Sequence, residues 1–223
     1  MNNEIISSLV PLGVGFVIYF TIHSWLASLR FKKFIARHRP SIMPAYRLIY
    51  NIVSVVLLLP LIWLMRQNPG PILWQWQGMM SLLMYTLMFA GIGGFFWSLR
   101  FYDNKVFLGW EQWKNRHRGT ENPDQLFIST MHRFVRHPWY FFILVILWTQ
   151  DMYLSQFVTY WLITLYLIVG SYLEERKLIK QYGEIYRVYC KKVPGLIPLP
   201  WRWMSKEEAR KLLTFSDDKP DEV

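Results

Sequence analysis

The chain has 223 residues, of which 53% are hydrophobic, and its formal net charge is +10. Its length fits a single domain spanning residues 1–223, and the hydrophobic content with a positive mean hydropathy indicates a polytopic membrane protein. Lys and Arg residues lie between the hydrophobic stretches, so membrane topology explains the charge better than nucleic-acid binding does. A single cysteine, Cys190, excludes an internal disulfide framework and a cysteine-rich zinc site, and we predict no metal site.

Five hydrophobic stretches predict the membrane helices. In chain order they cover residues 9–29, 48–65, 78–101, 139–148 and 153–173. The fourth is too short to cross a hydrocarbon core of about 30 Å at about 1.5 Å per residue. It therefore either extends through residue 153 or forms a short helix paired with the next, with a tight hairpin at Gln150-Asp151. We predict an all-α membrane bundle of about five transmembrane helices.

The connections differ in character. Residues 30–47 form a basic loop, residues 66–77 a short interfacial turn, and residues 102–136 a long polar segment that we expect to be a functional loop or a lid. At the C-terminus, Ser205-x-x-Glu208 is a capping-box pattern for a surface helix over 209–214. This gives the bundle a cytoplasmic amphipathic end, followed by a disordered tail at 216–223.

The distribution of positive charge predicts the orientation. Residues 30–47 hold six Lys and Arg, residues 100–138 hold seven and residues 174–223 hold eleven, whereas only Arg66 lies in another connection. The positive-inside rule makes the face with 24 of the 25 basic residues cytoplasmic. We therefore expect the N-terminus outside and the C-terminus in the cytoplasm, in the inner membrane of a bacterium.

Two features inside the membrane helices have alternative interpretations. His23 is a functional candidate because ionisable groups are costly at membrane depth, but it also fits a neutral imidazole bonded to a neighbouring helix. Gly91, Gly93 and Gly94 resemble part of a dinucleotide-binding loop, yet no strand precedes them. Close helix packing is the favoured interpretation of these glycines, and close approach to a ligand is the second.

The motifs that carry chemistry lie between residues 136 and 198. Pro138 favours the first turn of a helix, which places Arg136 and His137 at a helix N-terminus that attracts anions. Tyr140 follows on the same helix face as His137. Near the end of the fifth hydrophobic stretch, a helical stripe begins with a carboxylate and continues in aromatic residues: Glu175, Ile179, Tyr182, Tyr186, Tyr189 and Val193.

A helix N-terminus that attracts anions, together with a carboxylate and aromatic side chains, suits a ligand with a carboxylate, an ammonium group and a flat ring. S-adenosylmethionine has all three and a sulfonium in addition. The residue types therefore suggest this cofactor as a hypothesis.

The combined pattern also resembles a known superfamily. Arg136-His137-Pro138-x-Tyr140, then Glu174-Glu175-x-x-Leu178 and Tyr182-Gly183-x-x-Tyr186-x-x-Tyr189, is similar to the isoprenylcysteine carboxyl methyltransferases and phospholipid methyltransferases. Segments such as His23-Ser24-Trp25 resemble its small bacterial branch of methanethiol S-methyltransferases and NnrU-like proteins. One departure is Phe142, which stands where many members have glycine and which we expect to narrow the cofactor pocket.

The resemblance implies an integral-membrane methyltransferase that takes S-adenosylmethionine from the cytoplasm and a lipophilic acceptor from the bilayer. The acceptor classes left open are a thiol, an isoprenylcysteine-like carboxylate and a lipid. The implied cofactor-binding residues are Arg136, His137, Tyr140, Glu174, Glu175, Tyr186 and Tyr189. Glu174, His137 and Tyr140 are the candidates for deprotonating a thiol, and the sequence does not choose among them.

Two other functions remain open. Tyr189-Cys190-x-x-Val193-Pro194 also resembles the endings of membrane sterol and steroid reductases, which use NAD(P)H. The resemblance to NnrU-like proteins also allows an accessory membrane protein without catalytic activity. Binding of S-adenosylmethionine, or of NADPH, or of neither would separate the three.

Overall fold

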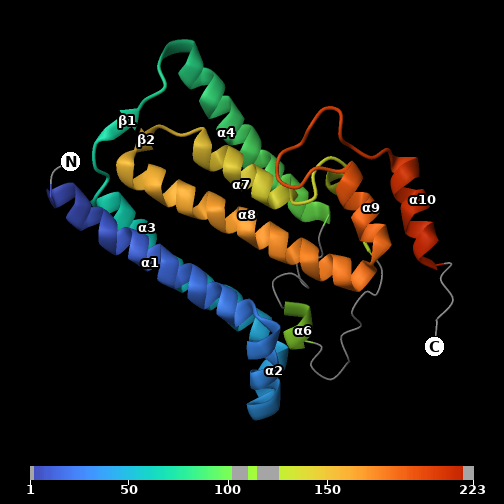
Figure 1. Ribbon diagram of the computed structural model, residues 1–223. Coiled ribbons are helices and arrows are strands. Elements are labelled where there is room, and N and C mark those ends of the chain that lie inside the picture. The colour runs from blue at the N-terminus through green and yellow to red at the C-terminus, as the bar shows by residue number, and fades with distance from the viewer. Residues whose placement is uncertain (1–2, 102–109, 115–125, 218–223) are drawn as a thin grey trace. The chain divides into compact units, whose positions relative to one another are not determined.

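The computed structural model describes residues 3–101, 110–114 and 126–217 (Figure 1). The chain divides into two compact units. The first unit comprises Met1–Ser81, Tyr102–Glu121 and Asp151–Ile163, and the second comprises Leu82–Phe101, Asn122–Gln150 and Thr164–Val223. Most of the predicted loop at 102–136 and of the predicted tail at 216–223 lies outside the described residues.

Four helices are long and apolar enough to cross a membrane: α1 (Asn3–Ala27), α3 (Tyr46–Gln67), α4 (Gly78–Ser98) and α8 (Leu154–Tyr182). They confirm the first, second, third and fifth predicted spans and the all-α membrane fold. α7 (Pro138–Trp148) has only 11 residues, so it extends about 17 Å. The described residues thus contain four full-length spans and a short apolar helix, and extension of α7 through residue 153 was wrong.

In the first unit α1 packs against α3. A Cβ added to Gly15 would come within 2.6 Å of Leu61, so the absence of a side chain lets the two helices approach. The Tyr46 hydroxyl donates to the Leu26 carbonyl at 2.5 Å near the other end of this pair. The same end continues in α2 (Leu29–His38) and the 3₁₀ turn η1 (Pro40–Ala45), so the loop predicted over 30–47 is largely helical.

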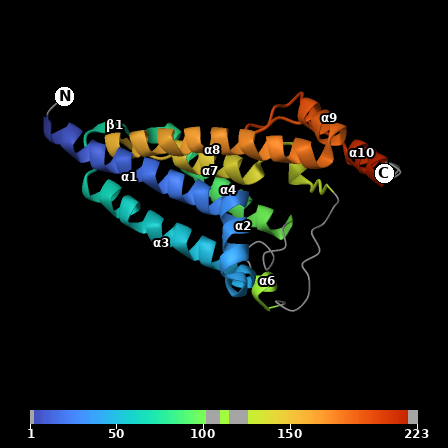
Figure 2. The ribbon, with the colours of Figure 1, turned by 60° about the horizontal axis from the view of Figure 1, so that its bottom comes forward.

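A short pair of strands lies at the end of the first unit opposite to α2 and η1. β1 (Ile72–Trp74) pairs antiparallel with β2 (Met152–Tyr153), and Asp151 accepts the backbone N–H of Trp76 at 2.9 Å. The N-terminus of α1 lies near β1 in both Figure 1 and Figure 2. This arrangement brings the N-terminal end of α1 and the 66–77 connection to one side of the first unit.

In the second unit the C-terminal part of α4 packs on α7 through glycines. A Cβ on Gly91 would lie 3.1 Å from Val145, and one on Gly94 would lie 2.3 Å from the Phe142 ring. Close packing is therefore confirmed for these two glycines, whereas a Cβ on Gly93 would meet nothing within 4 Å. Trp148 on α7 donates its indole N–H to Thr164 on α8 at 3.1 Å.

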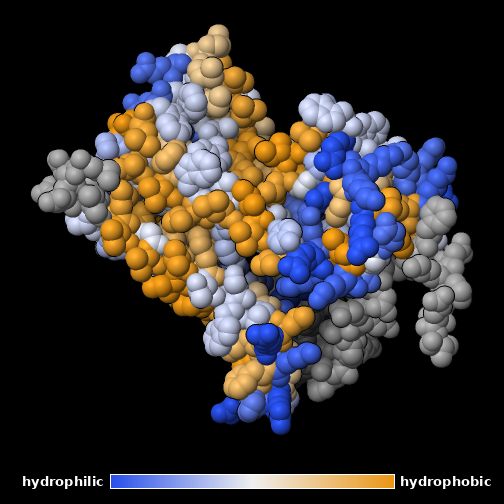
Figure 3. Space-filling view, viewed as in Figure 1, coloured by the Kyte–Doolittle hydropathy of each residue, from blue (hydrophilic) through white to orange (hydrophobic). Residues whose placement is uncertain are grey.

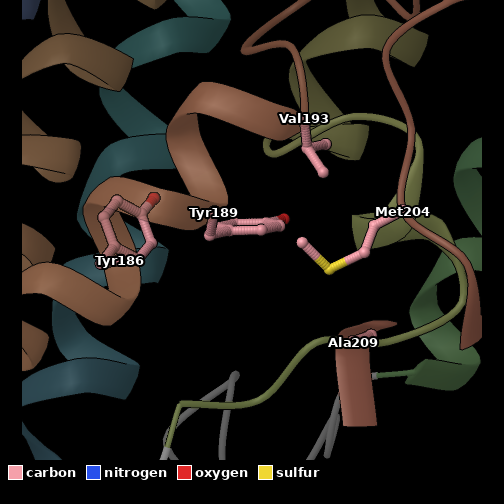
Figure 4. Packing of buried hydrophobic residues seen from close by; sticks show 5 residues of the cluster. All are labelled: Tyr186, Tyr189, Val193, Met204 and Ala209. Carbon is pink, nitrogen blue, oxygen red and sulfur yellow. The ribbon is translucent and has the colours of Figure 1, made fainter. Parts of the chain in front are cut away.

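The helix after the fifth span is interrupted. α8 ends at Tyr182, Gly183 has a φ of 61°, and α9 (Glu184–Lys192) starts afresh. Only glycine adopts such a conformation readily, so a single stripe from Glu175 to Val193 on one helix was wrong. Most residues of the stripe nevertheless lie close together. Ile179 and Tyr182 pack against a buried cluster that contains Tyr186, Tyr189, Val193, Met204 and Ala209 (Figure 4).

The C-terminal helix α10 (Lys206–Asp217) confirms the capping-box prediction. Ser205 Oγ accepts the Glu208 N–H at 3.1 Å, and the Glu208 carboxylate accepts the Ser205 N–H at 2.8 Å. Lys192 on α9 also forms an ion pair with Glu208. α10 is thereby fastened to α9, and its Ala209 lies in the buried cluster.

Candidate functional site

The motif at 136–140 is held by backbone bonds to the chain that follows α9. Before α7 begins, the Arg136 N–H donates to the Pro194 carbonyl at 2.9 Å and the His137 N–H donates to the Gly195 carbonyl at 3.0 Å. His137 is the residue that caps α7, with a non-helical backbone, and Pro138 occupies the first helical position as predicted. The motif and the Val193-Pro194 segment are therefore neighbours in the second unit.

Arg136 and Glu175 form a two-pronged ion pair. Nε and Nη2 of Arg136 donate to the two carboxylate oxygens of Glu175, each at 2.9 Å. Nη1 donates to the Cys190 carbonyl at 2.9 Å and also to the Val193 carbonyl. The two side chains are only 11% and 17% exposed, so this pair fastens the end of α9 to α8.

Gly195 passes close to this pair. A Cβ at Gly195 would lie 3.3 Å from Nη2 of Arg136 and 3.7 Å from Oε1 of Glu175. Every nitrogen of the Arg136 guanidinium already donates to a protein acceptor. The group predicted to hold a cofactor carboxylate thus has its donors engaged within the protein.

His137 lies between two carboxylates. Its Nε2 is 3.0 Å from Glu175 Oε1, and its Nδ1 is 3.5 Å from Glu174 Oε2. The His137 side chain is 7% exposed, whereas the Glu174 side chain is 51% exposed. The structure therefore brings Arg136, His137, Glu174 and Glu175 together, with Glu174 as the acid that faces outward.

Tyr140 completes this group. Its ring stacks on His137 with centroids 5.2 Å apart and an interplanar angle of 10°. A Cβ at Gly170 on α8 would lie 3.9 Å from the Tyr140 hydroxyl, an ordinary van der Waals distance, so Tyr140 lies against α8. His137 and Tyr140 thus form a flat aromatic pair beside the Glu174 carboxylate.

Tyr186 and Tyr189 belong to the neighbouring α9, and the charges of Glu175 and Arg136 act on the Tyr186 hydroxyl. They are 2% and 3% exposed and belong to the buried cluster, where their rings meet edge to face 5.5 Å apart (Figure 4). The Tyr189 hydroxyl donates to the His132 carbonyl at 2.6 Å, and burial raises the pKa of Tyr186. These contacts give both residues a packing role, and their role in lining a cofactor pocket stays a prediction.

The ring of Phe142 points to α4. It occupies the space beside Gly94 of α4, and α4 carries none of the motif residues. Gly94 of α4 therefore leaves room for the ring of Phe142, which stands where many members of the superfamily have a glycine after the motif.

Three polar contacts near the motif were missed. Oγ of the buried Ser129 lies 2.7 Å from Nδ1 of His132, and Arg202 donates to the carbonyls of Cys190 and Lys191. Burial, and then the electrostatic effect of His137, lower the pKa of His132 to about 4. No pattern reveals these contacts, because His132 lies in a single 3₁₀ turn (Met131–Arg133) and Arg202 binds main-chain atoms.

His23 belongs to the first unit and is bonded to a neighbouring helix. Its Nε2 lies 2.7 Å from the Tyr50 hydroxyl and its Nδ1 lies 3.0 Å from Ser54 Oγ, both on α3. The structural interpretation of His23 is therefore confirmed. Among residues 3–101, 110–114 and 126–217, no group of three or more His, Cys, Asp and Glu side chains is arranged to hold a metal ion.

Several named bacterial proteins are similar to this chain. Methanethiol S-methyltransferase 2 of Bradyrhizobium diazoefficiens is 31% identical over 178 residues, which are 79% of this chain and 68% of that protein. Methanethiol S-methyltransferase of Pseudomonas deceptionensis is 30% identical over 180 residues, covering 79% and 67% of the two chains. That of Mycobacterium tuberculosis is 29% identical over 217 residues, covering 91% and 81%. No family model and no solved structure matches the chain.

Proposed function

Because the chain belongs to the family of the methanethiol S-methyltransferases, we propose that it transfers a methyl group from S-adenosylmethionine to a small lipophilic thiol. The chain is an integral-membrane methyltransferase. The relatives are named for a thiol acceptor, which favours a thiol over an isoprenylcysteine-like carboxylate or a lipid. The donor and the acceptor are the parts of this proposal that require testing.

The observation that carries the proposal is the half-exposed Glu174 carboxylate beside the buried His137 and the partly buried Tyr140, whose rings stack. S-adenosylmethionine carries a positive sulfonium and an ammonium group, and an accessible carboxylate suits either one. Glu175 is less available, since both of its oxygens accept from Arg136. The Glu174 carboxylate with its aromatic neighbours therefore suits a positively charged cofactor.

We assign roles on this basis. Glu174, His137 and Tyr140 bind the cofactor and contact the reacting groups. Arg136 and Glu175 are positioning residues, because their ion pair holds His137 and the 193–195 segment in place. Tyr186 and Tyr189 support the same segment from the buried cluster.

The chemistry requires little from the protein. When bound, S-adenosylmethionine would supply a sulfonium methyl group to an in-line acceptor thiolate, and its own carbon–sulfur bond would break with the electron pair kept by the departing thioether sulfur. Glu174 takes the thiol proton and passes it to water, while positioning and exclusion of water supply much of the acceleration.

The orientation follows from the charge distribution. We propose that the N-terminus lies outside and that the basic face with α9 and α10 is cytoplasmic, since that face holds 24 of the 25 Lys and Arg residues. This orientation exposes Glu174 to the compartment in which S-adenosylmethionine is made. Reporter fusions after Val223 and near Gly70 test it, and reporters on one and the same side would contradict it.

The function is tested with the full chain purified in detergent. Methanethiol and labelled S-adenosylmethionine should give labelled dimethyl sulfide, and Glu174→Gln should abolish most of the turnover. Glu184→Gln is the matched control, because Glu184 is a similarly exposed acid whose ion pair is with Arg187 on its own helix. Its turnover should equal that of the unmodified protein.

Other results would select another function. Label in phospholipid or in a prenylcysteine analogue alone would refute the thiol acceptor. Calorimetric binding of NADPH without S-adenosylmethionine would indicate a reductase, and binding of neither would indicate an accessory protein. Equal loss of turnover in both Glu variants would show that Glu174 has no special role.

A further inference from the structure

α2 begins where the first membrane helix ends. α1 ends at Ala27 and α2 starts at Leu29, with Ser28 between them as the capping residue. The Ser28 hydroxyl accepts the Phe31 N–H at 3.2 Å, which stabilises the new helix at this break. The helix axis changes direction there, as Figures 1 and 2 show. α2 therefore lies at the boundary of the membrane that α1 crosses.

One side of α2 is strongly basic. Arg30, Lys33 and Arg37 follow a spacing of three and four residues, so they share one helix face. Lys32 and Arg39 add further charge, and residues 28–45 contain no acid. None of the ten residues of α2 is buried, and Figure 3 shows hydrophilic residues gathered at this end of the first unit.

The other side of α2 is aromatic and partly exposed. Phe31 contacts Trp25 of α1 with ring centroids 4.2 Å apart, so α2 is anchored to the membrane helix. Phe34, which stacks on Phe31, is still 53% exposed. A helix with exposed aromatic residues opposite a basic face is typical of segments that lie in the headgroup region of a membrane.

A pair of tryptophans supports this location. α6 (Trp110–Lys114) lies against η1, which in turn packs against α2. Trp110 and Trp113 are 47% and 43% exposed. Tryptophan side chains prefer the membrane–water interface, so α6 and α2 present interfacial residues in one unit.

We infer that α2 binds the anionic headgroups of phospholipids. The basic face has the complementary charge, the aromatic face suits the acyl boundary, and the link to α1 holds both at the right depth. A basic residue near an anionic surface contributes about a five-fold change in affinity, so removal of three charges should weaken binding roughly 100-fold at low salt. This surface belongs to the first unit, whereas the residues assigned to methyl transfer belong to the second.

Native mass spectrometry of the full chain in detergent tests this binding. The protein is titrated with phosphatidylglycerol and with phosphatidylcholine of the same acyl chains. Phosphatidylglycerol should bind more tightly, and added sodium chloride should weaken its binding. The triple variant R30Q/K33Q/R37Q should lose this preference, whereas K206Q/R210Q/K211Q should retain it, because that variant removes the same charge from exposed positions of α10.

Thermal unfolding checks that both variants are folded, independently of methyl transfer. Equal binding of the two lipids to the unmodified protein would overturn the inference. So would an equal loss of binding in both variants, which would indicate a diffuse effect of net charge. If the α2 variant does not fold, salt-independent binding of phosphatidylglycerol to the unmodified protein would overturn it instead.

Discussion

The ring of Phe142 on α7 fills the space in which Gly94 of α4 would otherwise carry a side chain. A Cβ on Gly94 would lie 2.3 Å from Cε1 of Phe142, and it would also clash with two further atoms of the ring. The two residues are 48 positions apart and belong to the same unit. A large residue in the motif is therefore matched by a small one on the helix that it faces.

The Gly94→Ala variant should be destabilised by about 1–3 kcal/mol, because the added methyl group forces the ring or the helix to move. Thermal unfolding in detergent measures the effect. Gly93→Ala is the control, since a Cβ there meets nothing within 4 Å, and it should leave the midpoint almost unchanged. Adding Phe142→Leu to Gly94→Ala should restore part of the lost stability. If both alanine variants are equally stable, the contact does not limit the packing.

The Arg136–Glu175 pair should be costly to break from either side. Arg136→Lys cannot reproduce the two-pronged contact, and Glu175→Gln leaves a largely enclosed guanidinium without its partner charge. We expect a loss of about 3–5 kcal/mol in unfolding free energy for Glu175→Gln, since it removes one partner of a buried pair.

The exposed pair of Arg187 and Glu184 gives the comparison for that experiment. Both of its side chains are about 60% exposed, so Arg187→Gln should cost less than about 1 kcal/mol. Denaturant unfolding in detergent measures both variants. Equal effects on stability would mean that the Arg136–Glu175 pair does not fasten α9 to α8.

The spacing of residues in the sequence predicted the local features of this fold better than it predicted which distant residues contact one another. Pro138 as the first residue of α7 and the capping box at Ser205 depend on neighbours in sequence, and the structure confirms both. Apolar length likewise located the four long spans. The break at Gly183 was missed because a helical stripe of apolar residues continues on both sides of it, and a glycine in a stripe does not by itself indicate a positive φ.

The candidate site shows the same division. The motif spacing predicted one site containing Arg136, His137, Tyr140, Glu174 and Glu175, and the structure places all five together. Their individual environments depend on contacts across the fold. The sequence could not show that Arg136 donates to the Cys190 carbonyl, or that Glu175 is enclosed while Glu174 is half exposed.

Tyr189→Phe separates a packing role from a cofactor-lining role. It removes the 2.6 Å bond to the His132 carbonyl and should cost about 1–3 kcal/mol of stability, because a buried acceptor loses its donor. The affinity for S-adenosylmethionine, measured by calorimetry, should stay unchanged. Tyr182→Phe is the control, since its hydroxyl contacts the exposed Gln181 side chain. A weaker affinity with unchanged stability would instead place Tyr189 in the cofactor pocket.

The stability of the second unit should depend on the protonation of His132. Burial lowers the pKa of His132 from 6.5 to about 4, with a further contribution from His137. Between these two values the unfolded chain binds a proton that the folded chain does not, so stability is fully present above pH 6.5 and decreases as the pH falls towards 4. The thermal midpoint in detergent should therefore drop between pH 7 and pH 5.

The control variant is His132→Gln, whose side chain can still bond to Ser129. It should be less stable than the unmodified protein at pH 7 but should lose much less stability on acidification. Because the other titrating groups are common to both proteins, the difference between the two pH profiles isolates His132. Parallel profiles would show that His132 protonation does not contribute to the acid sensitivity of this unit.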